Sequence, residues 1–395
     1  MRLEGVTVWD GDRLVGAADV TLDGDRVAEV APVPGPRADG LALIPGLVDT
    51  HVHLTDPAVP GDYTTFTWPL VTPVADRTLH ALANARAALE SGVTTMRDMA
   101  SDERPIALRR AFDAGLVAGP RVLAYGVVNM TAGHHDMFTP AGAPVRPETA
   151  DGPDACRALV RKHARAGVDG IKMMTSGGVL STGDRSGWRN YTAAEIAAIT
   201  DEAHALGLPV AAHAHSEAGI AAALDGGADS LEHATLISEE QARAAAARGV
   251  TAAPTLLIND RIADGSAGAT AESRDKAAAL VAARDAKLRR AADLGVRFVL
   301  GTDCNATINP FGAAMPELAR MRDVLGYDDE QALRAGTSDA ADALGLGDRV
   351  GRITPGRAAD LLLVRGRPWA DITDLTAANL VAVISRGTLA YGTLS

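Results

Sequence analysis

LALIPGLVDTHVHL, residues 41 to 54, is the most informative stretch of the chain, because two apolar runs meet at Pro45-Gly46 and the second ends in two histidines. Side chains two apart in a strand point to the same face, so His51 and His53 converge at the strand's end. Neutral imidazoles placed in this way are good ligands for a divalent transition metal. On its own, an H-x-H tripeptide is more often two polar residues at the mouth of a strand, so the interpretation depends on the rest of the chain.

Short apolar segments recur along the middle of the chain, and the segments between them are rich in Ala, Arg and Glu at helical spacing. Eight such βα units predict an α/β fold, a closed (β/α)8 TIM-type barrel, with chemistry at the C-terminal ends of the strands. The expected strands are 47–53, 93–98, 121–127, 169–174, 208–213, 228–233, 249–255 and 296–303, and expected helices include 76–91, 151–167, 192–207 and 270–294.

Both ends of the chain have the sequence pattern of short strands joined by turns. Asp-Gly pairs at 10–11 and 23–24 lie between alternating apolar residues, which is a strong hairpin signal. Near the C-terminus, GRAADLLLVRG and NLVAVISRGTLAYG have the same pattern. We therefore expect one small β-sandwich made from both termini, with residues 1–46 and 346–395 enclosing a barrel at 47–345.

Composition restricts the class of protein. The formal net charge of -12 argues against a nucleic-acid surface, which needs clustered positive charge. The two cysteines, Cys156 and Cys304, have no disulfide or zinc-cluster spacing, which suits a reducing cytoplasm. We find neither a signal-peptide pattern at the start nor a window of 18 apolar residues. These features predict a cytoplasmic protein that binds neither nucleic acid nor membrane.

Near the ends of four further expected strands lie a lysine, Lys172, and three residues with metal-binding chemistry, His213, His233 and Asp303. A lysine inside a barrel is costly unless it is neutralised or paired, and the chain has only four lysines. Either histidine alone would more often be a core residue. Together with the H-x-H pair, however, they form a ring at one end of the barrel, and Asp303 can both bind a metal and accept a proton. The joint pattern predicts a metallohydrolase site.

PGLVDTHVHL, this ring of residues and PGRAADL at 355–361 resemble the amidohydrolase superfamily. GVTTMRDMAS and IKMMTSGGVLSTGD extend the similarity to a binuclear subgroup that resembles Xaa-Pro and Xaa-Arg dipeptidases, ochratoxin amidases and imidazolonepropionases. The resemblance implies two divalent ions, with Zn²⁺ expected first and Mn, Co or Ni also compatible, bridged by Lys172 carboxylated by CO₂. It further implies that a metal-bridging hydroxide attacks the substrate carbonyl, while Asp303 transfers a proton to the leaving amine.

The same resemblance suggests groups that face the substrate. His134 in NMTAGHHD matches the Gly-His of a Gly-Gly-His loop, although Ala132 stands where the subgroup has its first Gly. His134 would polarise the substrate carbonyl or hold a carboxylate, and we interpret His135 as a loop residue. His215 is two residues beyond His213, so it should share the barrel-facing side; we favour a contact with substrate over a role in supporting the metal ligands.

Other candidates are less specific. Tyr191 lies downstream of the fourth strand, and Arg185 and Arg189 lie in the loop after it, where a guanidinium could clamp a substrate carboxylate. Arginines in such loops are more often solvated. The insertion at 57–73, which gathers Tyr63, Phe66 and Trp68, suggests either a hydrophobic lid over the site or an oligomer contact.

The leading prediction is a hydrolase of an amide bond next to a free carboxylate, in a dipeptide or N-acyl amino acid, acting as a homo-oligomer. A deaminase or cyclic-amidine hydrolase with one metal is an alternative. Such relatives typically have Glu two or three residues beyond the fifth-strand histidine and lack the lysine, whereas this chain has His215, Ser216 and Lys172. An inactive structural relative would have lost a ligand. Hydrolysis of an ester, lactone or carbamate on the same site remains open.

Overall fold

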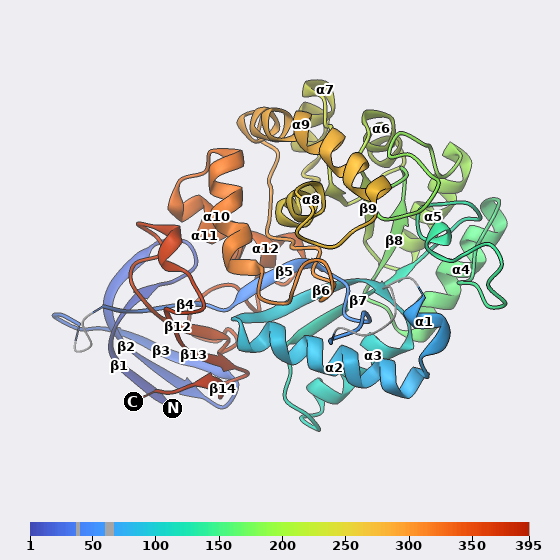
Figure 1. Cartoon of the computed structure of the whole chain (residues 1–395). Helices are drawn as coiled ribbons and strands as arrows, with labels where there is room; N and C mark the ends of the chain where they lie inside the picture. Colours follow the sequence, from blue (N-terminus) through green and yellow to red (C-terminus); the bar gives the residue numbers. More distant parts are fainter. Residues whose placement is uncertain (37–39, 60–66, 395) are drawn as a thin grey trace.

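The computed structural model describes residues 1–36, 40–59 and 67–394. In this part of the chain the strands form two seven-stranded sheets (Figure 1). The first is a parallel sheet with the strand order β11-β10-β9-β8-β7-β6-β5, which is the sequential order of a barrel. Its strands are β5 (Leu47–Val52), β6 (Val93–Ser101), β7 (Arg121–Val127), β8 (Gly170–Met174), β9 (Val210–Ala214), β10 (Ser230–His233) and β11 (Thr251–Ala253).

The eighth expected strand, 296–303, closes the barrel without forming a continuous strand. Isolated parallel bridges join Phe298 to Ala252 on one side and Cys304 to Val52 on the other. The N–H of Leu300 instead donates to the carbonyl of Ala335 at 2.8 Å, so a neighbouring turn takes a group that a regular strand would pair. The predicted barrel fold is confirmed, with its last strand reduced to two bridges.

Helices cover the outside of the barrel (Figure 1). Local signals begin and end several of them: Thr192 and Glu195 form a capping box at the start of α5, and α4 ends at the left-handed Gly167. The helices are α1 (Trp68–Val71), α2 (Val74–Glu90), α3 (Glu103–Asp113), α4 (Pro153–Ala166), α5 (Ala193–Ala205), α6 (Glu217–Asp225), α7 (Glu239–Arg248), α8 (Leu256–Ala263), α9 (Ala271–Asp293), α10 (Ala314–Leu325), α11 (Asp329–Ala335) and α12 (Ser338–Ala343), with 3₁₀ turns η1 (Asp136–Phe138) and η2 (Ile372–Asp374).

The second sheet combines the two ends of the chain, as expected. Its order is β14-β13-β12-β4-β1-β2-β3, and side chains from both halves share one apolar core. The Asp-Gly pairs form the β1–β2 and β2–β3 hairpins. The strands are β1 (Arg2–Trp9), β2 (Leu14–Asp23), β3 (Arg26–Pro32), β4 (Leu41–Pro45), β12 (Leu361–Arg365), β13 (Leu380–Ser385) and β14 (Thr388–Gly392).

Gly46 is the point at which the chain passes from one sheet to the other. β4 pairs with β1 and β12, whereas β5 pairs with β6. A Cβ on Gly46 would lie 2.2 Å from the Thr94 hydroxyl, so only glycine fits against this side chain. This junction delivers β5, and with it His51 and His53, into the barrel. The domain limits 1–46, 47–345 and 346–395 remain a prediction.

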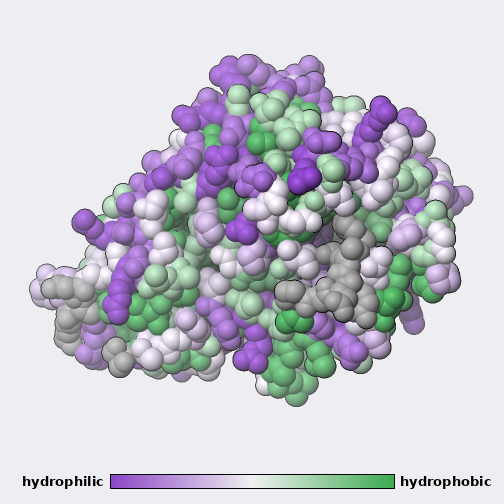
Figure 2. All heavy atoms as spheres, viewed as in Figure 1, coloured by the Kyte–Doolittle hydropathy of each residue, from purple (hydrophilic) through white to green (hydrophobic). Residues whose placement is uncertain are grey.

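Apolar side chains gather on the surface over α1 and the start of α2 (Figure 2), where Leu70, Val71 and Val74 are exposed. Such a group beside a cavity is a candidate contact surface. Within the described ranges, no helix is both long enough and apolar enough to cross a bilayer.

Candidate active site

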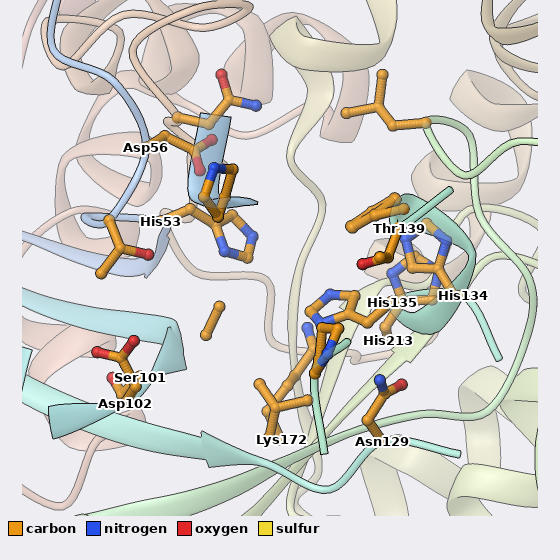
Figure 3. Close-up of a pocket in the computed structure, with 18 of the residues that line it drawn as sticks. His53, Asp56, Ser101, Asp102, Asn129, His134, His135, Thr139, Lys172 and His213 are labelled. Atoms are coloured by element: carbon orange, nitrogen blue, oxygen red, sulfur yellow. The ribbon is translucent and has the colours of Figure 1, made fainter. Parts of the chain in front are cut away.

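The strand ends bring all the predicted metal ligands to one cavity of about 650 Å³. Figure 3 shows His53 on one wall, His134 on the opposite wall, and Lys172 and His213 between them. The six predicted ligands that line the cavity are His51, His53, Lys172, His213, His233 and Asp303. Residues spread over 253 positions of the sequence therefore meet at the C-terminal end of the barrel.

The ligand atoms lie close enough to share ions. His51, His233 and Asp303 each offer one atom, and these atoms lie within 4.8 Å of one another. Around Asp303, the Nε2 atoms of His53 and His51 lie 3.0 Å and 3.5 Å from the Oδ1 atom. On the other side, His213, His215 and His233 form a second group within 4.8 Å. Imidazole nitrogens with a carboxylate fit a divalent transition metal.

A buried carboxylate orients His51. Nδ1 of His51 lies 2.7 Å from Oε2 of Glu232, while the other carboxylate oxygen of Glu232 accepts from Arg97 at 2.8 Å and from Ser230 at 2.8 Å. Although burial raises the pKa of Glu232, the charge of Arg97 and the contact with His51 outweigh it and hold that pKa well below its usual range. Glu232 thus stays ionised and leaves Nε2 of His51 directed at the cavity.

Neutral groups orient the histidines of β9 and β10. Nδ1 of His233 lies 2.6 Å from the Thr255 hydroxyl, so its Nε2 is the free ring nitrogen. In His213, by contrast, Nε2 lies 3.3 Å from the carbonyl of Gly177, so Nδ1 is free. A ring nitrogen with a fixed partner on the far side is the usual arrangement around a bound metal.

Several residues here have a left-handed backbone conformation, with positive φ, which residues other than glycine rarely adopt. The φ angles are 72° at His233, 49° at Ala234, 46° at Thr255 and 54° at Asp303. Each residue lies at or just after a strand end. Strain of this kind collects at functional sites, where the fold holds a side chain in a direction that a regular strand would not give it.

Burial keeps most of the imidazoles neutral. It lowers the pKa of His51 to about 4, with the charge of Lys172 acting in the same direction, and it holds the pKa values of His213 and His233 well below their ordinary value. His53 differs: burial lowers its pKa, but the hydrogen bond and charge of Asp303 raise it further than burial lowers it. Neutral imidazole is the form that binds metal.

Lys172 is 1% exposed, and burial lowers the pKa of its amine to about 8 despite the opposing charges of Glu232 and Asp303. Within the described ranges, its amine makes no hydrogen bond or close ion pair. A buried amine without a partner is unusual, because desolvation of the charged form is costly. The structure therefore leaves this nitrogen free to react or to bind.

His134 forms part of the cavity wall. Its Nδ1 lies 2.7 Å from the Ser181 hydroxyl and 3.7 Å from Asp184, and its ring stacks on His213 with 4.4 Å between centroids. Gly178 makes room for it, since a Cβ there would lie 1.9 Å from the imidazole. Burial lowers the pKa of His134. The ring is thus fixed at the wall with Nε2 unused by these contacts.

Comparison with known proteins identifies the family. A model described as the amidohydrolase family matches residues 42–390. The chain belongs to the amidohydrolase family. Ochratoxinase of Aspergillus niger is 31% identical over 353 residues, which cover 84% of this chain and 71% of that enzyme. The crystal structure of a prolidase complexed with N-methylphosphonate-L-proline superimposes with a TM-score of 0.87 and 31% identity, covering 98% of each chain.

A crystal structure of a Xaa-Pro dipeptidase with bound methionine also matches, with a TM-score of 0.87 and 28% identity over 98% of this chain and 99% of that one. The predicted family is therefore confirmed, and this amidohydrolase is a hydrolase of carbon–nitrogen bonds acting on small molecules. Metal-dependent amide hydrolysis is the general chemistry of such a site.

The structure does not bring three predicted substrate contacts of this amidohydrolase to the cavity. Tyr191 is 1% exposed and packs in the core, where its hydroxyl donates to the carbonyl of Val128 at 2.6 Å. Arg185 and Arg189 are exposed and do not line the cavity. The loop folds back on itself through a bridge between Ser176 and Arg189, which turns both arginines to solvent.

His215 does line the cavity, as its spacing from His213 suggested, and its Nδ1 lies 2.8 Å from the Thr235 hydroxyl. Burial lowers the pKa of His215 to about 3. It belongs to the second group of possible ligands, so it faces the same space as the metal-binding residues. Whether it contacts substrate remains a prediction.

Sequence reasoning missed other residues of the wall. His135, interpreted as a loop residue, lines the cavity, as do Asp56 and Asn129 (Figure 3). Both polar atoms of the Asn129 side chain are buried without a hydrogen-bond partner. The adjacent histidines of GHHD gave a signal for His135, but Asp56 and Asn129 have no motif of their own.

The aromatic insertion is only partly described. Trp68 is buried and packs edge-on against His80, with 5.1 Å between ring centroids, while Pro69 and Leu70 line the cavity. Tyr63 and Phe66 lie outside the described residues. The described end of the insertion thus contributes to the cavity wall.

Proposed function

We propose that this amidohydrolase cleaves an amide bond next to a free carboxylate, in a dipeptide or N-acyl amino acid. The carrying observation is the ring of six predicted ligands around one cavity, with the unpartnered Lys172 amine inside it. Relatives named ochratoxinase, prolidase and Xaa-Pro dipeptidase support this substrate class. A homo-oligomeric state and a cytoplasmic location stay predictions.

Two divalent ions fit the donor set. His51, His53 and Asp303 would hold one ion, and His213 and His233 the other. Burial favours the neutral amine of Lys172, which can form an N–C bond to CO₂ and release a proton, giving a carbamate whose two oxygens suit a bridge. When bound, such ions lower the pKa of water and polarise a carbonyl. Zinc is the first expectation.

Asp303 would move the proton. Burial raises its pKa, but the charges of His51 and His53 lower it more, so the carboxylate starts ionised. Its Oδ1 can accept the proton of the attacking water and then donate it to the nitrogen of the leaving amine, which departs as the C–N bond breaks.

His134 and His215 would face the substrate from the wall and floor of the cavity. In the tautomer that this role requires, the Ser181 hydroxyl donates to Nδ1 of His134, and Nε2–H donates to a substrate oxygen. A donor so placed stabilises negative charge as it develops on the carbonyl oxygen.

The test joins metal content to a substrate screen. Elemental analysis should give close to two metals per chain, and the same preparation should release free amino acids from N-acyl amino acids or dipeptides. Asp303→Asn should retain the fold and lose turnover by about a hundredfold or more. About one metal per chain, with ammonia released from heterocycles, would instead favour the mononuclear deaminase or cyclic-amidine hydrolase. Turnover of esters, lactones or carbamates alone would replace the amide assignment.

A further inference from the structure

The cavity wall contains more positive charge than the reaction described above uses. Apart from Lys172, four cationic side chains line it in the described part of the chain, and three of them pair with acidic neighbours. Arg146 donates to Asp136 at 2.7 Å, and Lys162 is paired with Glu148. Arg104 pairs with Asp102, whereas Arg77 has no ion pair among the described residues.

Arg77 lies in the first turn of α2 and is half-buried. No ion pair or side-chain hydrogen bond of Arg77 is found among the described residues, and its Nε is buried without a partner. A guanidinium has five donors, and leaving a buried one unsatisfied costs free energy unless a ligand satisfies it.

Arg104 lies in the first turn of α3 and is 6% exposed. Its Nε donates to both carboxylate oxygens of Asp102 at 2.9 Å, and its Nη2 also contacts that carboxylate. Asp102 thus occupies one edge of the guanidinium. The remaining nitrogen, Nη1, is buried without a hydrogen-bond partner.

The two arginines are close enough for the charge of Arg104 to affect the pKa of Arg77. Burial lowers the pKa of Arg77, and the charge of Arg104 lowers it further, while Asp102 and the exposed Glu103 act in the opposite direction. Asp56, which also lines the cavity, is near both Arg104 and His53, and burial raises its pKa to about 7, so it neutralises the arginines only in part. A guanidinium without an acidic partner, next to a second guanidinium, forms a suitable environment for an anion.

Asp102, the partner of Arg104, lies on the wall opposite His134. Figure 3 shows Asp56, Ser101 and Asp102 on the side of His53, with His134 and Thr139 across the cavity. A substrate held between the walls would therefore present one end to the arginine side and the other to His134. Arg185 and Arg189, for which the sequence suggested a carboxylate clamp, are absent from both walls.

We propose that the guanidinium of Arg77, with the charge of Arg104 beside it, binds a carboxylate of the substrate and so selects anionic substrates. The inference rests on the proposed function and deepens it by assigning the carboxylate to the α2 and α3 side of the cavity. That carboxylate belongs either to the α-carbon of the leaving amino acid or to an acidic side chain, and the experiment separates the two sources.

Binding is measured first, by calorimetry with metal-loaded protein and two probes, 3-phenylpropanoate and its uncharged isostere 3-phenylpropanamide. Arg77→Gln should weaken the carboxylate by about tenfold or more and leave the amide within about twofold. The control is Arg86→Gln on the same helix, because Arg86 pairs with Glu90 and does not line this cavity. Equal loss for both probes, or no loss for either, would overturn the site. Any contact of the carboxylate with bound metal is the same in the wild type, Arg77→Gln and Arg86→Gln, so it does not contribute to the differences in affinity.

Kinetics then identifies the source of the carboxylate. With an N-acyl amino acid, Arg77→Gln should raise KM about tenfold with kcat nearly unchanged, while the corresponding C-terminal amide is unaffected. If the side chain is the source, the variant instead loses only the preference for N-acylaspartate over N-acylasparagine. If the wild type cleaves none of these compounds, the proposed function fails, but the binding experiment still decides the carboxylate site.

Stability provides an independent readout. Because Arg77 makes no ion pair in the described structure, Arg77→Gln should leave Tm unchanged or raise it, whereas Arg104→Gln should lower Tm by breaking the contact with Asp102. Arg77→Lys should restore only part of the carboxylate affinity, since an ammonium lacks the planar fork. A lower Tm in Arg77→Gln would indicate a structural role and contradict the proposal.

Discussion

Two His-x-His pairs end strands on opposite sides of the cavity, and they differ in the groups that their imidazoles contact. His51 and His53, at the end of β5, lie against carboxylates: Nδ1 of His51 contacts Glu232 at 2.7 Å, and Nε2 of His53 contacts Asp303 at 3.0 Å. This pair therefore carries its own negative charge, which favours a bound cation.

His213 and His215, at the end of β9, have neutral partners instead. His213 contacts the carbonyl of Gly177, and His215 contacts the hydroxyl of Thr235. The same tripeptide pattern thus forms an anionic side and a neutral side of one cavity. On the neutral side, the charge that a divalent ion requires has to come from elsewhere, and a carbamate on Lys172 would supply it.

Removing that charge should have the largest effect. Lys172→Ala is expected to lower metal content from about two ions per chain to about one and to reduce kcat/KM by about a thousandfold or more. Small carboxylic acids added to the variant should partly restore both, because they can replace the bridging oxygens. Elemental analysis and steady-state kinetics measure these quantities.

Lys287→Ala is a matched control, since Lys287 pairs with Glu217 on the surface and lies away from the cavity. It should keep both metals and full turnover. Turnover of Lys172→Ala at the wild-type rate would contradict the carbamate and remove the reason for distinguishing the two sides.

The second prediction compares directly the two groups that contact Nδ1 of His51 and Nδ1 of His215. Glu232→Gln should weaken metal binding by about 10- to 100-fold, whereas Thr235→Val should weaken it by less than about tenfold, because only Glu232 contributes charge. Competition with a chelator of known affinity gives both values.

Glu232→Gln also leaves Arg97 with a weaker partner, so its Tm must be measured beside the affinity. Affinity lost only in proportion to stability would mean that Glu232 acts through the fold. Equal affinity losses in the two variants would show that the two sides do not differ in the way their partners suggest.

The barrel and the ligand ring were predictable because both follow from periodicity. Apolar segments of strand length recur at regular intervals, and parallel strands end at the same edge, so residues such as Lys172 and His213 had to meet. The eighth strand was the exception: its apolar sequence predicts a strand, but Leu300 gives its N–H to Ala335. Competition of that kind arises between segments far apart and leaves no local pattern.

Glu232 was hidden by the same alternation rule that revealed the ring. Neighbours in a strand point to opposite faces, so a cavity-facing His233 implies that Glu232 faces away. The left-handed backbone at His233, with φ of 72°, breaks the rule and lets both side chains serve the site. Arg185 and Tyr191 lie away from the cavity for a related reason, since loop and core positions depend on tertiary packing that a single sequence does not specify.

The last comparison concerns a second buried glutamate, which supports the neutral side. Glu317 is 0% exposed, and its carboxylate accepts from the N–H groups of Leu256 at 2.6 Å and Leu257 at 3.0 Å. It thereby caps α8 immediately after Thr255, the residue that contacts His233. Without an adjacent ion pair like that of Glu232 with Arg97, burial raises the pKa of Glu317 from 4.5 to about 8.

That shift gives a defined pH dependence. Between pH 4.5 and about 8 the folded protein holds a proton on Glu317 that the unfolded chain has released, so this group's contribution to the unfolding free energy falls as pH rises, by up to about 1.4 kcal/mol per pH unit. Urea unfolding of the wild type and Glu317→Gln across this range measures the difference. Because glutamine does not titrate, stability of the variant relative to wild type should increase from pH 5 to pH 8. A constant difference would mean that Glu317 ionises at its ordinary pKa, and the neutral side would then rest on a charged carboxylate after all, as the side of His51 does.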